Sequence, residues 1–254
     1  MIGGKGNDQR GGRDLRARMI CHARHMSGAV YLGGGGSASD EAAVWDEMLD
    51  GVRSLLYWPV ALSGTMLTGA EQWLRAGLAG RPTITVTTWM DLSEHAGDPL
   101  SAFDLIFVGG GNTFDLHHRL STAGLESSLR SFLGNGGRYY GGSAGAVLAG
   151  RSIGIAAGID DDRIGAADHS ALGLIGADLL PHYSPDWLGH ARDWSVRHPD
   201  RLLIGIPEAG GIGCVMEDPT ERVRAIGPDP VRLFRRGEMI GEVAAGEDFA
   251  LTVQ

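Results

Sequence analysis

Short apolar runs alternate with amphipathic segments along the first part of the chain, and several of the runs end in glycine. An apolar run of strand length bounded by turn residues is typical of a buried strand, whereas apolar residues recurring every three or four positions indicate a helix. This pattern predicts strands over residues 29–32, 54–62, 83–89, 103–108 and 138–142. It predicts helices over residues 40–49, 70–79, 114–120 and 125–133, the first of them capped by Ser39 or Asp40.

The alternation of strands and helices predicts an α/β fold, with a mostly parallel sheet flanked by helices on both faces. After residue 150 the pattern loosens, until a strongly apolar run at 202–206 predicts another buried strand. The remainder predicts a small antiparallel C-terminal portion with strands over residues 223–226, 231–234, 239–243 and 251–253. We expect residues 28–254 to form a single domain, preceded by a disordered extension over residues 1–27.

Composition and charge narrow the class of protein. The 254 residues are 43% hydrophobic, which is enough for a full core, and the net charge of −9 argues against a nucleic-acid partner. The two cysteines, Cys21 and Cys214, do not predict a disulfide framework or a thiolate zinc site, and they fit a reducing cytoplasm. The chain has no apolar run of about 18 residues, so we expect no membrane partner.

One serine lies in a glycine turn at the end of the strand predicted over residues 138–142. Gly141, Ser143 and Gly145 have the G-x-S-x-G spacing of a nucleophile elbow, in which a strand turns sharply into a helix. Glycine removes the Cβ that would clash where the strand and the helix meet. The serine hydroxyl would then lie exposed at the end of a sheet, near the N-terminus of the next helix. The alternative is a glycine-rich turn with an incidental serine.

A second glycine cluster, Gly109–Thr113, follows the strand predicted over residues 103–108. Both glycine clusters therefore fall at the carboxyl ends of parallel strands, where function collects in such sheets. The backbone N–H groups of this cluster could form an oxyanion hole or a nest for an anionic phosphate, although the Gly-Lys-Ser/Thr of a P-loop is absent. Residues 33–38 match the dinucleotide-binding fingerprint only weakly, and a plain strand-end turn is favoured there.

A serine nucleophile needs a general base and a group that orients the base. Among the nine histidines, only His182 follows a buried apolar segment at a proline-marked strand end, where a rigid base is expected. Two acids are candidates for its partner. Asp160 lies in the loop between Ser143 and His182, and Glu208 follows the predicted strand at 202–206 in a Pro-Glu turn. A solvated acidic loop and a turn-capping carboxylate are the alternative interpretations of these two acids.

Taken together, these residues resemble peptidase family S51, which contains the aspartyl dipeptidases (peptidase E) and the cyanophycinases. The resemblance rests on four segments in order, residues 107–114, 142–146, 181–183 and 205–208. It implies a fold similar to a class I glutamine amidotransferase domain, with Ser143 as nucleophile and His182 as general base. It allows either Asp160 or Glu208 as the acid, and Glu208 is preferred because a strand end is more rigid than a loop. The matching oxyanion residues are Gly110, Gly111 and Ala144.

The resemblance also implies a substrate. Peptidase E cleaves dipeptides with an N-terminal aspartate, and Arg192 matches the basic residue that is thought to hold the aspartate side chain. Asn112 and Thr113 are further candidates for substrate binding. We therefore expect a cytoplasmic serine peptidase that hydrolyses an amide next to an aspartyl residue through an acyl-enzyme. Its expected partner is a small peptide, it needs no metal or organic cofactor, and homodimer formation is left open.

Departures from the family pattern bear on the substrate more than on the chemistry. Gly142 stands where peptidase E has tryptophan, and Ala209 stands where it has glycine. The nearest alternative is a cyanophycinase-like hydrolase of β-aspartyl-arginine, and a ligand-binding relative without turnover is the alternative from another class. An α/β-hydrolase is disfavoured, because the interval between Ser143 and His182 is short for the intervening strands of that fold.

Overall fold

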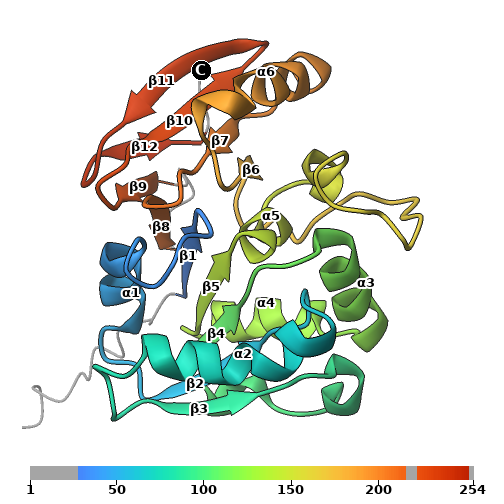
Figure 1. The fold of residues 1–254 in the computed structure, drawn as a ribbon, viewed down its shortest axis with the longest axis vertical. Coiled ribbons are helices and arrows are strands. Elements are labelled where there is room, and N and C mark those ends of the chain that lie inside the picture. The colour runs from blue at the N-terminus through green and yellow to red at the C-terminus, as the bar shows by residue number, and fades with distance from the viewer. Residues whose placement is uncertain (1–27, 216–221, 252–254) are drawn as a thin grey trace, which may run out of the picture.

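The computed structural model describes residues 28–215 and 222–251, and the predicted extension at 1–27 and positions 252–253 of the last predicted strand lie outside this range. An eight-stranded central sheet has the order β12-β9-β8-β1-β5-β4-β2-β3 (Figure 1). Its parallel strands are β1 (Ala29–Gly33), β2 (Ser54–Trp58), β3 (Thr85–Thr88), β4 (Leu105–Val108) and β5 (Arg138–Gly142). The predicted α/β fold with a mostly parallel core sheet is confirmed.

Part of the C-terminal region extends the central sheet with antiparallel strands. β8 (Gly211–Val215) pairs with β1, β9 (Arg222–Ile226) pairs with β8, and β12 (Asp248–Ala250) pairs with β9. The sequence pattern does not predict β8 because glycine occupies alternate positions of it. These glycines leave space for neighbouring side chains, since a Cβ at Gly211 would lie 2.4 Å from the Val44 side chain.

The remaining strands form a second sheet with the order β11-β10-β7-β6, above the central sheet in Figure 1. Its strands are β6 (Asp178–Leu180), β7 (Leu203–Gly205), β10 (Val231–Arg235) and β11 (Glu238–Val243). β6 and β7 are parallel, and the other neighbours are antiparallel. The helix α6 (Leu188–Arg197) packs on this sheet. Its sequence is mostly polar, and only Ala191, Trp194 and Ser195 are buried, so the apolar pattern does not predict it.

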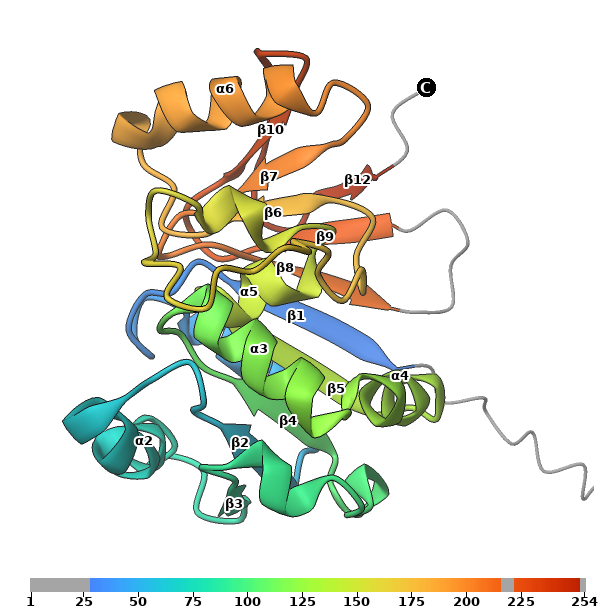
Figure 2. The same ribbon diagram turned by 90° about the vertical axis from the view of Figure 1, so that its right-hand side faces the viewer.

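Helices cover both faces of the central sheet (Figure 2). One face carries α1 (Ala42–Leu49) and α2 (Gly64–Gly77), and the other carries α3 (Thr113–Ala123), α4 (Glu126–Gly134) and α5 (Ala144–Ala149). Successive side chains of a strand point to opposite faces. Leu55 and Tyr57 therefore pack toward α1 and α2, whereas Leu56 and Trp58 pack toward α3, α4 and α5. Among the described helices, none is long and apolar enough to cross a membrane.

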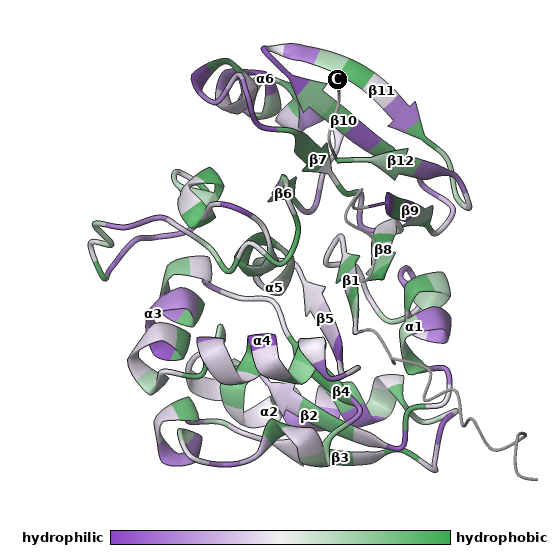
Figure 3. Cartoon of the chain, turned by 180° about the vertical axis from the view of Figure 1, so that it is seen from behind, coloured by the Kyte–Doolittle hydropathy of each residue, from purple (hydrophilic) through white to green (hydrophobic). Residues whose placement is uncertain are grey.

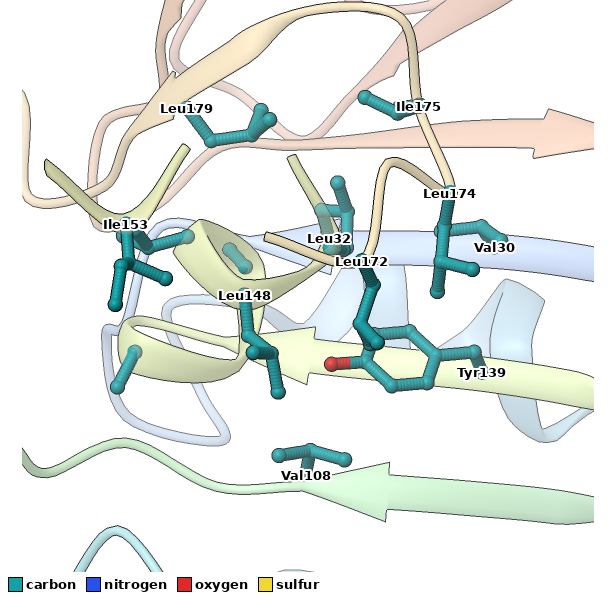
Figure 4. Close-up of a cluster of buried hydrophobic side chains, with 14 of the residues drawn as sticks. Val30, Leu32, Val108, Tyr139, Leu148, Ile153, Leu172, Leu174, Ile175 and Leu179 are labelled. Carbon is teal, nitrogen blue, oxygen red and sulfur yellow. The ribbon is translucent and has the colours of Figure 1, made fainter. Parts of the chain in front are cut away.

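The larger apolar cluster joins the central sheet to the second sheet. Figure 4 shows part of it, in which Leu148 of α5 and Tyr139 of β5 lie below Leu179 of β6. The Tyr139 hydroxyl donates a hydrogen bond to the Gly145 carbonyl at 2.8 Å, and burial raises the pKa of this phenol. In Figure 3 the buried strands β1 and β7 are green, whereas parts of α6 are purple. The two sheets therefore share one core rather than packing as separate bodies.

The start of α1 differs from the prediction. α1 begins at Ala42 with Glu41 at the N-cap position, and neither Ser39 nor Asp40 caps it. Asp40 instead accepts hydrogen bonds from the hydroxyl and the N–H of Ser37, which lower the pKa of its carboxyl. The Glu41 side chain is buried, with 2% of its surface exposed.

Candidate active site

The glycine turn after β5 has the geometry of an elbow. Ser143 lies between β5 and α5 with φ 52° and ψ −114°, a conformation that residues other than glycine rarely adopt. A Cβ at Gly141 would lie 2.4 Å from the Gly145 carbonyl oxygen, and a Cβ at Gly145 would lie 2.5 Å from the Val108 carbonyl oxygen. Both glycines are therefore needed for the strand and the helix to meet here, and the turn leaves the Ser143 side chain half-buried at the sheet edge.

His182 and Glu208 follow the neighbouring parallel strands β6 and β7. The pairing continues beyond the strands, because the Ile206 N–H donates to the Leu180 carbonyl at 2.9 Å and the Tyr183 N–H donates to the Ile206 carbonyl at 3.0 Å. Parallel strands in register deliver the residues that follow them to the same edge of the sheet. The register of β6 and β7 thus brings together two residues that are far apart in the sequence.

Ser143, His182 and Glu208 form a continuous hydrogen-bonded chain. The Ser143 Oγ lies 2.9 Å from Nε2 of His182, and Nδ1 of the same ring lies 3.0 Å from Oε1 of Glu208. The side chain of His182 is 41% exposed and that of Glu208 is 62% exposed, so solvent has most access at the acidic end. A serine nucleophile, its base and the acid that orients the base require this arrangement.

The other candidate acid, Asp160, makes its hydrogen bond to the glycine loop instead of the histidine. Its Oδ2 accepts from the Thr113 N–H at 2.7 Å. The neighbouring Asn112 caps α3, since its Oδ1 accepts from the Asp115 N–H at 2.9 Å, and its Nδ2 donates to the Asp161 carbonyl at 2.9 Å. These side chains are thus engaged in holding the acidic loop against the start of α3.

The three candidate oxyanion residues, Gly110, Gly111 and Ala144, lie beside Ser143. A Cβ at Gly110 would lie 3.0 Å from the Ser143 Cβ and 3.3 Å from its Oγ. Gly111 and Ala144 line a cavity together with Ser143. Within residues 28–215 and 222–251, these three N–H groups donate no hydrogen bond. Unpaired backbone donors next to a nucleophile can stabilise a developing oxyanion.

The glycine loop after β1, residues 33–36, contacts all members of the hydrogen-bonded chain, although the sequence pattern favours a plain turn there. The Ser143 N–H donates to the carbonyl of the first glycine at 3.4 Å, and the His182 N–H donates to that of the second at 2.8 Å. A Cβ on the last glycine would lie 2.4 Å from the Glu208 carbonyl oxygen. The only signal in the sequence is a run of four glycines at a strand end.

Gly35 of this loop packs directly against the reacting groups. Its φ is +91°, and a Cβ there would lie 2.5 Å from the His182 ring and 2.9 Å from the Ser143 Cβ. The Gly35 N–H donates to Oε1 of the buried Glu41 at 2.7 Å. No side chain fits at this position without moving the histidine, so the loop must carry glycine here.

The buried Glu41 side chain holds the glycine loop at 33–36 by a hydrogen bond. Besides Gly35, its carboxylate accepts hydrogen bonds from Trp45 Nε1 at 3.2 Å and from the Tyr140 hydroxyl. Burial raises the pKa of Glu41, and the hydrogen bonds from Tyr140, Gly35 and Trp45 oppose this shift without cancelling it. Sequence analysis missed this residue because helical spacing alone does not show that its side chain turns inward.

The comparison with known families agrees with this geometry. The sequence model of peptidase family S51 matches residues 41–209, a range that contains Ser143, His182 and Glu208. The chain belongs to peptidase family S51. Membership of this family makes it a serine-type peptidase, in agreement with the resemblance seen in the sequence motifs.

Curated relatives of this peptidase carry the name peptidase E. The peptidase E of Nostoc sp. is 31% identical over 156 residues, which cover 58% of this chain and 62% of the Nostoc protein, less than two thirds of its length. That of Shewanella amazonensis is 32% identical over 171 residues, covering 63% of this chain and 70% of the relative. A peptidase E of Streptomyces coelicolor is 32% identical over 169 residues, covering 62% and 67% of the two chains.

Two solved structures share the fold of the peptidase. A peptidase from an acI-B1 Actinobacterium superposes with a TM-score of 0.65 at 20% identity, covering 89% of this chain and 98% of the other. A candidate peptidase E from Listeria monocytogenes superposes with a TM-score of 0.61 at 19% identity, covering 78% and 96% of the two chains. At these identities the likeness concerns the fold alone.

Two cavities of the peptidase meet at Ser143 and His182. The larger, of about 480 Å³, lies on the side of α2 and is lined by apolar and aromatic side chains. The smaller, of about 240 Å³, lies on the side of α5 and includes Asp160, Thr113 and Trp187. Among the described residues, no group of three His, Cys, Asp or Glu side chains is placed to hold a metal ion.

Arg192 lies on the exposed side of α6 and does not line either cavity. Its guanidinium makes no ion pair with the part of the chain that the structure describes. Burial raises the pKa of Tyr183, and the charges of Arg232 and Arg192 act against this shift. The structure therefore leaves this cation available without bringing it into contact with Ser143.

Proposed function

We propose that the peptidase hydrolyses an amide bond of a short peptide through an acyl-enzyme on Ser143. The observation that carries the proposal is the hydrogen-bonded chain of Ser143, His182 and Glu208, with separations of 2.9 Å and 3.0 Å. Glu208 accepts the Nδ1–H of His182, which leaves Nε2 free to take the proton from the Ser143 hydroxyl. The freed Oγ attacks the carbonyl carbon of the scissile bond.

The oxyanion of the tetrahedral intermediate is stabilised by backbone N–H groups of Gly110, Gly111 and Ala144. His182 then gives its proton to the leaving amine, the carbon–nitrogen bond breaks, and an ester to Ser143 remains. In the second half-reaction His182 takes a proton from water, the hydroxide attacks the ester, and the proton returns to Oγ as the acid leaves. The partnerless N–H groups support this assignment.

The proposed substrate is a dipeptide with an N-terminal aspartate. Arg192 is the cation proposed to attract the aspartyl carboxylate, because it is exposed and has no ion-pair partner among the described residues. Neither cavity wall contains a lysine or an arginine, so the carboxylate needs a cation from outside the walls. Trp187, which directly precedes α6, lines the smaller cavity, and this supports binding of the aspartyl residue on that side. The cytoplasmic location expected from the cysteines stays a prediction.

A serine-directed fluorophosphonate and a dipeptide assay test this function. We expect the reagent to label the wild-type protein at Ser143 and the wild type to cleave Asp-Leu, and Ser143→Ala to lose both properties. Loss of the nucleophile should lower kcat by about 10⁴-fold or more. If the wild type is not labelled and leaves Asp-Leu, β-Asp-Arg and a simple ester intact, the protein is a ligand-binding relative without turnover. Preferential cleavage of β-Asp-Arg would contradict the proposed substrate while retaining the proposed chemistry.

A further inference from the structure

A row of three aromatic side chains forms one wall of the larger cavity. Tyr57 on β2 is paired with Phe107 on β4, and Phe107 is paired with Tyr140 on β5. Residues paired in adjacent strands point to the same face of the sheet. The three rings therefore lie side by side, each at most 3% exposed, and all of them line the cavity next to Ser143.

The opposite wall comes from α2 and is also apolar. Met66 is 63% exposed and Trp73 is 48% exposed, and both line the cavity. Trp73 meets Trp45 and Phe107 edge to face, with ring centroids 6.1 Å and 6.4 Å apart, so its ring is held in place. Large apolar side chains exposed beside a nucleophile are typical of a ligand-binding surface.

This cavity is uncharged. Among the described residues that line it there is no Lys, Arg, Asp or Glu. Burial raises the pKa of Tyr57 to about 12, so its phenol is neutral at physiological pH, and the Tyr140 hydroxyl is engaged with Glu41. An ionised side chain would lose its hydration here without gaining a counter-charge, whereas an apolar side chain gains by leaving water.

We propose that this cavity binds the side chain of the residue after the scissile bond and selects large apolar or aromatic residues there. This inference rests on the proposed function, because it takes Ser143 as the nucleophile and aspartate as the residue before the bond. The uncharged cavity offers an aspartyl carboxylate no counter-charge. The proposed function places the aspartyl residue on the α5 side of Ser143, within the attraction of a cation outside the cavity walls. The leaving residue then lies between the row of Tyr57, Phe107 and Tyr140 and the helix α2. The substrate class is accordingly Asp-X with X aromatic or large aliphatic.

A panel of Asp-X dipeptides tests the selectivity. We expect kcat/KM to be about 10- to 100-fold higher for Asp-Phe and Asp-Leu than for Asp-Ala, since a few methylene equivalents in an apolar pocket give discrimination of that size. Asp-Arg should be a poorer substrate than Asp-Ala. Equal values for Asp-Phe and Asp-Ala, or a preference for Asp-Arg, would overturn the proposal.

A glycine of α2 allows the cavity to be filled without damage to the fold. Gly69 lines the cavity, and a Cβ there would meet no atom within 4 Å. Gly69→Leu therefore adds volume at the cavity, and leucine is a better helix former than glycine. Gly134→Leu in α4 is the matched control, because Gly134 is also exposed, helical and free of neighbours within 4 Å, but does not line the cavity.

We expect Gly69→Leu to lower kcat/KM for Asp-Phe by about tenfold more than it lowers kcat/KM for Asp-Ala, so that the preference for Asp-Phe shrinks or disappears. Gly134→Leu should change neither value. A uniform fall for both substrates in Gly69→Leu, with Asp-Phe still preferred, would contradict the proposed subsite.

Labelling of Ser143 by a fluorophosphonate reports the proposed function separately. If wild-type protein is neither labelled nor active, the proposed function fails, and calorimetric binding of Asp-Phe and Asp-Ala decides the inference on the cavity. Tighter binding of Asp-Phe that is lost in Gly69→Leu supports the cavity as an apolar side-chain site. Equal affinity for the two dipeptides overturns it.

Discussion

The two sheets of the molecule hold their parts of the site in different ways. The central sheet supplies Ser143 from a turn in which crowded glycines fix the backbone, with φ 52° at the serine. The second sheet supplies His182 and Glu208 from the ends of β6 and β7, where their side chains are 41% and 62% exposed. The nucleophile is therefore held in a crowded glycine turn, whereas the base and the acid follow two strands that are paired in register. Like Ser143, His182 has a positive φ, of 54°.

Because the catalytic groups come from two sheets, the glycine loop at 33–36, which contacts both sets, helps to align them. The loop starts at Gly33, the last residue of β1 in the central sheet. Its carbonyl groups nevertheless accept hydrogen bonds from the N–H groups of both Ser143 and His182. It therefore links the nucleophile of the central sheet to the base of the second sheet. Substitutions at Glu208 after the second sheet, at Gly35 in the loop and at Glu41, which holds the loop, should consequently lower kcat to different extents.

The largest effect is expected at the acid of the second sheet. Glu208→Ala removes the group that accepts the Nδ1–H of His182, so kcat should fall by about 10²- to 10⁴-fold. Asp160→Ala is the matched comparison, because it removes a carboxylate that bonds to the Thr113 N–H instead. We expect it to lower kcat by less than about tenfold. Steady-state kinetics with Asp-Leu measures both variants, and a larger loss in Asp160→Ala would reverse the assignment of the acid.

An intermediate effect is expected in the loop that joins the two sheets. Gly35→Ala places a methyl group against the His182 ring, and displacement of the base by about 1 Å should lower kcat by about 10²-fold. Gly51→Ala is the control, because Gly51 also has a positive φ, +72°, but a Cβ there meets no atom within 4 Å. In thermal melts Gly51→Ala should report the cost of the positive φ alone, and Gly35→Ala should lose more stability because it adds the clash with His182. If their kcat values are equal, contact with Gly35 does not position the base.

The smallest effect on kcat is expected at Glu41, whose carboxylate holds the glycine loop. Glu41→Gln keeps the size of the side chain but weakens the set of hydrogen bonds that it accepts from Gly35, Trp45 and Tyr140, so kcat should fall by about three- to tenfold. Unchanged kcat would show that the carboxylate does not act through the loop.

Glu41→Gln should also change how the stability of the folded protein depends on pH. Burial raises the pKa of Glu41 in the folded protein, so its proton-linked stability is fully present below the unfolded pKa near 4.5 and is lost as the pH rises through the folded pKa. The melting temperature of the wild type relative to Glu41→Gln should therefore fall with rising pH above about 4.5. Melting curves from pH 4 to pH 8 measure this difference, and a difference that grows with pH would contradict the raised pKa.

The sequence allowed the central sheet and the elbow to be predicted because their signals are local. Apolar runs ended by glycine mark the parallel strands, and the spacing of Gly141, Ser143 and Gly145 marks the turn. The role of Glu41 could not be predicted, because the Tyr140 hydroxyl that meets its carboxylate comes from a distant strand. In the same way, a strand-end turn at Gly35 gives no sign that a histidine ring packs on it.

The choice between Asp160 and Glu208 depends on tertiary structure. Sequence favoured Glu208 only by its position after a strand, whereas the geometry depends on how β6 and β7 are paired. The helix α6 could not be predicted from the spacing of apolar residues either, because it buries few residues against a small sheet. Elements that pack through a single narrow contact leave too few apolar positions for a periodic signal.

The central place of β1 has a consequence for how the protein folds. β1 is the first strand of the described chain to be synthesised, yet its two neighbours are β5 and β8, which come much later. Pairing between distant segments is slow, and a strand waiting for its partners exposes unpaired edges during that time. The glycine loop that follows β1 is also tied to the residue before β8, because the Gly34 N–H donates to the Gly210 carbonyl at 3.1 Å. Docking of β8 on β1 therefore completes both the central sheet and the anchoring of the loop that contacts Ser143 and His182, so the site should form only late in folding.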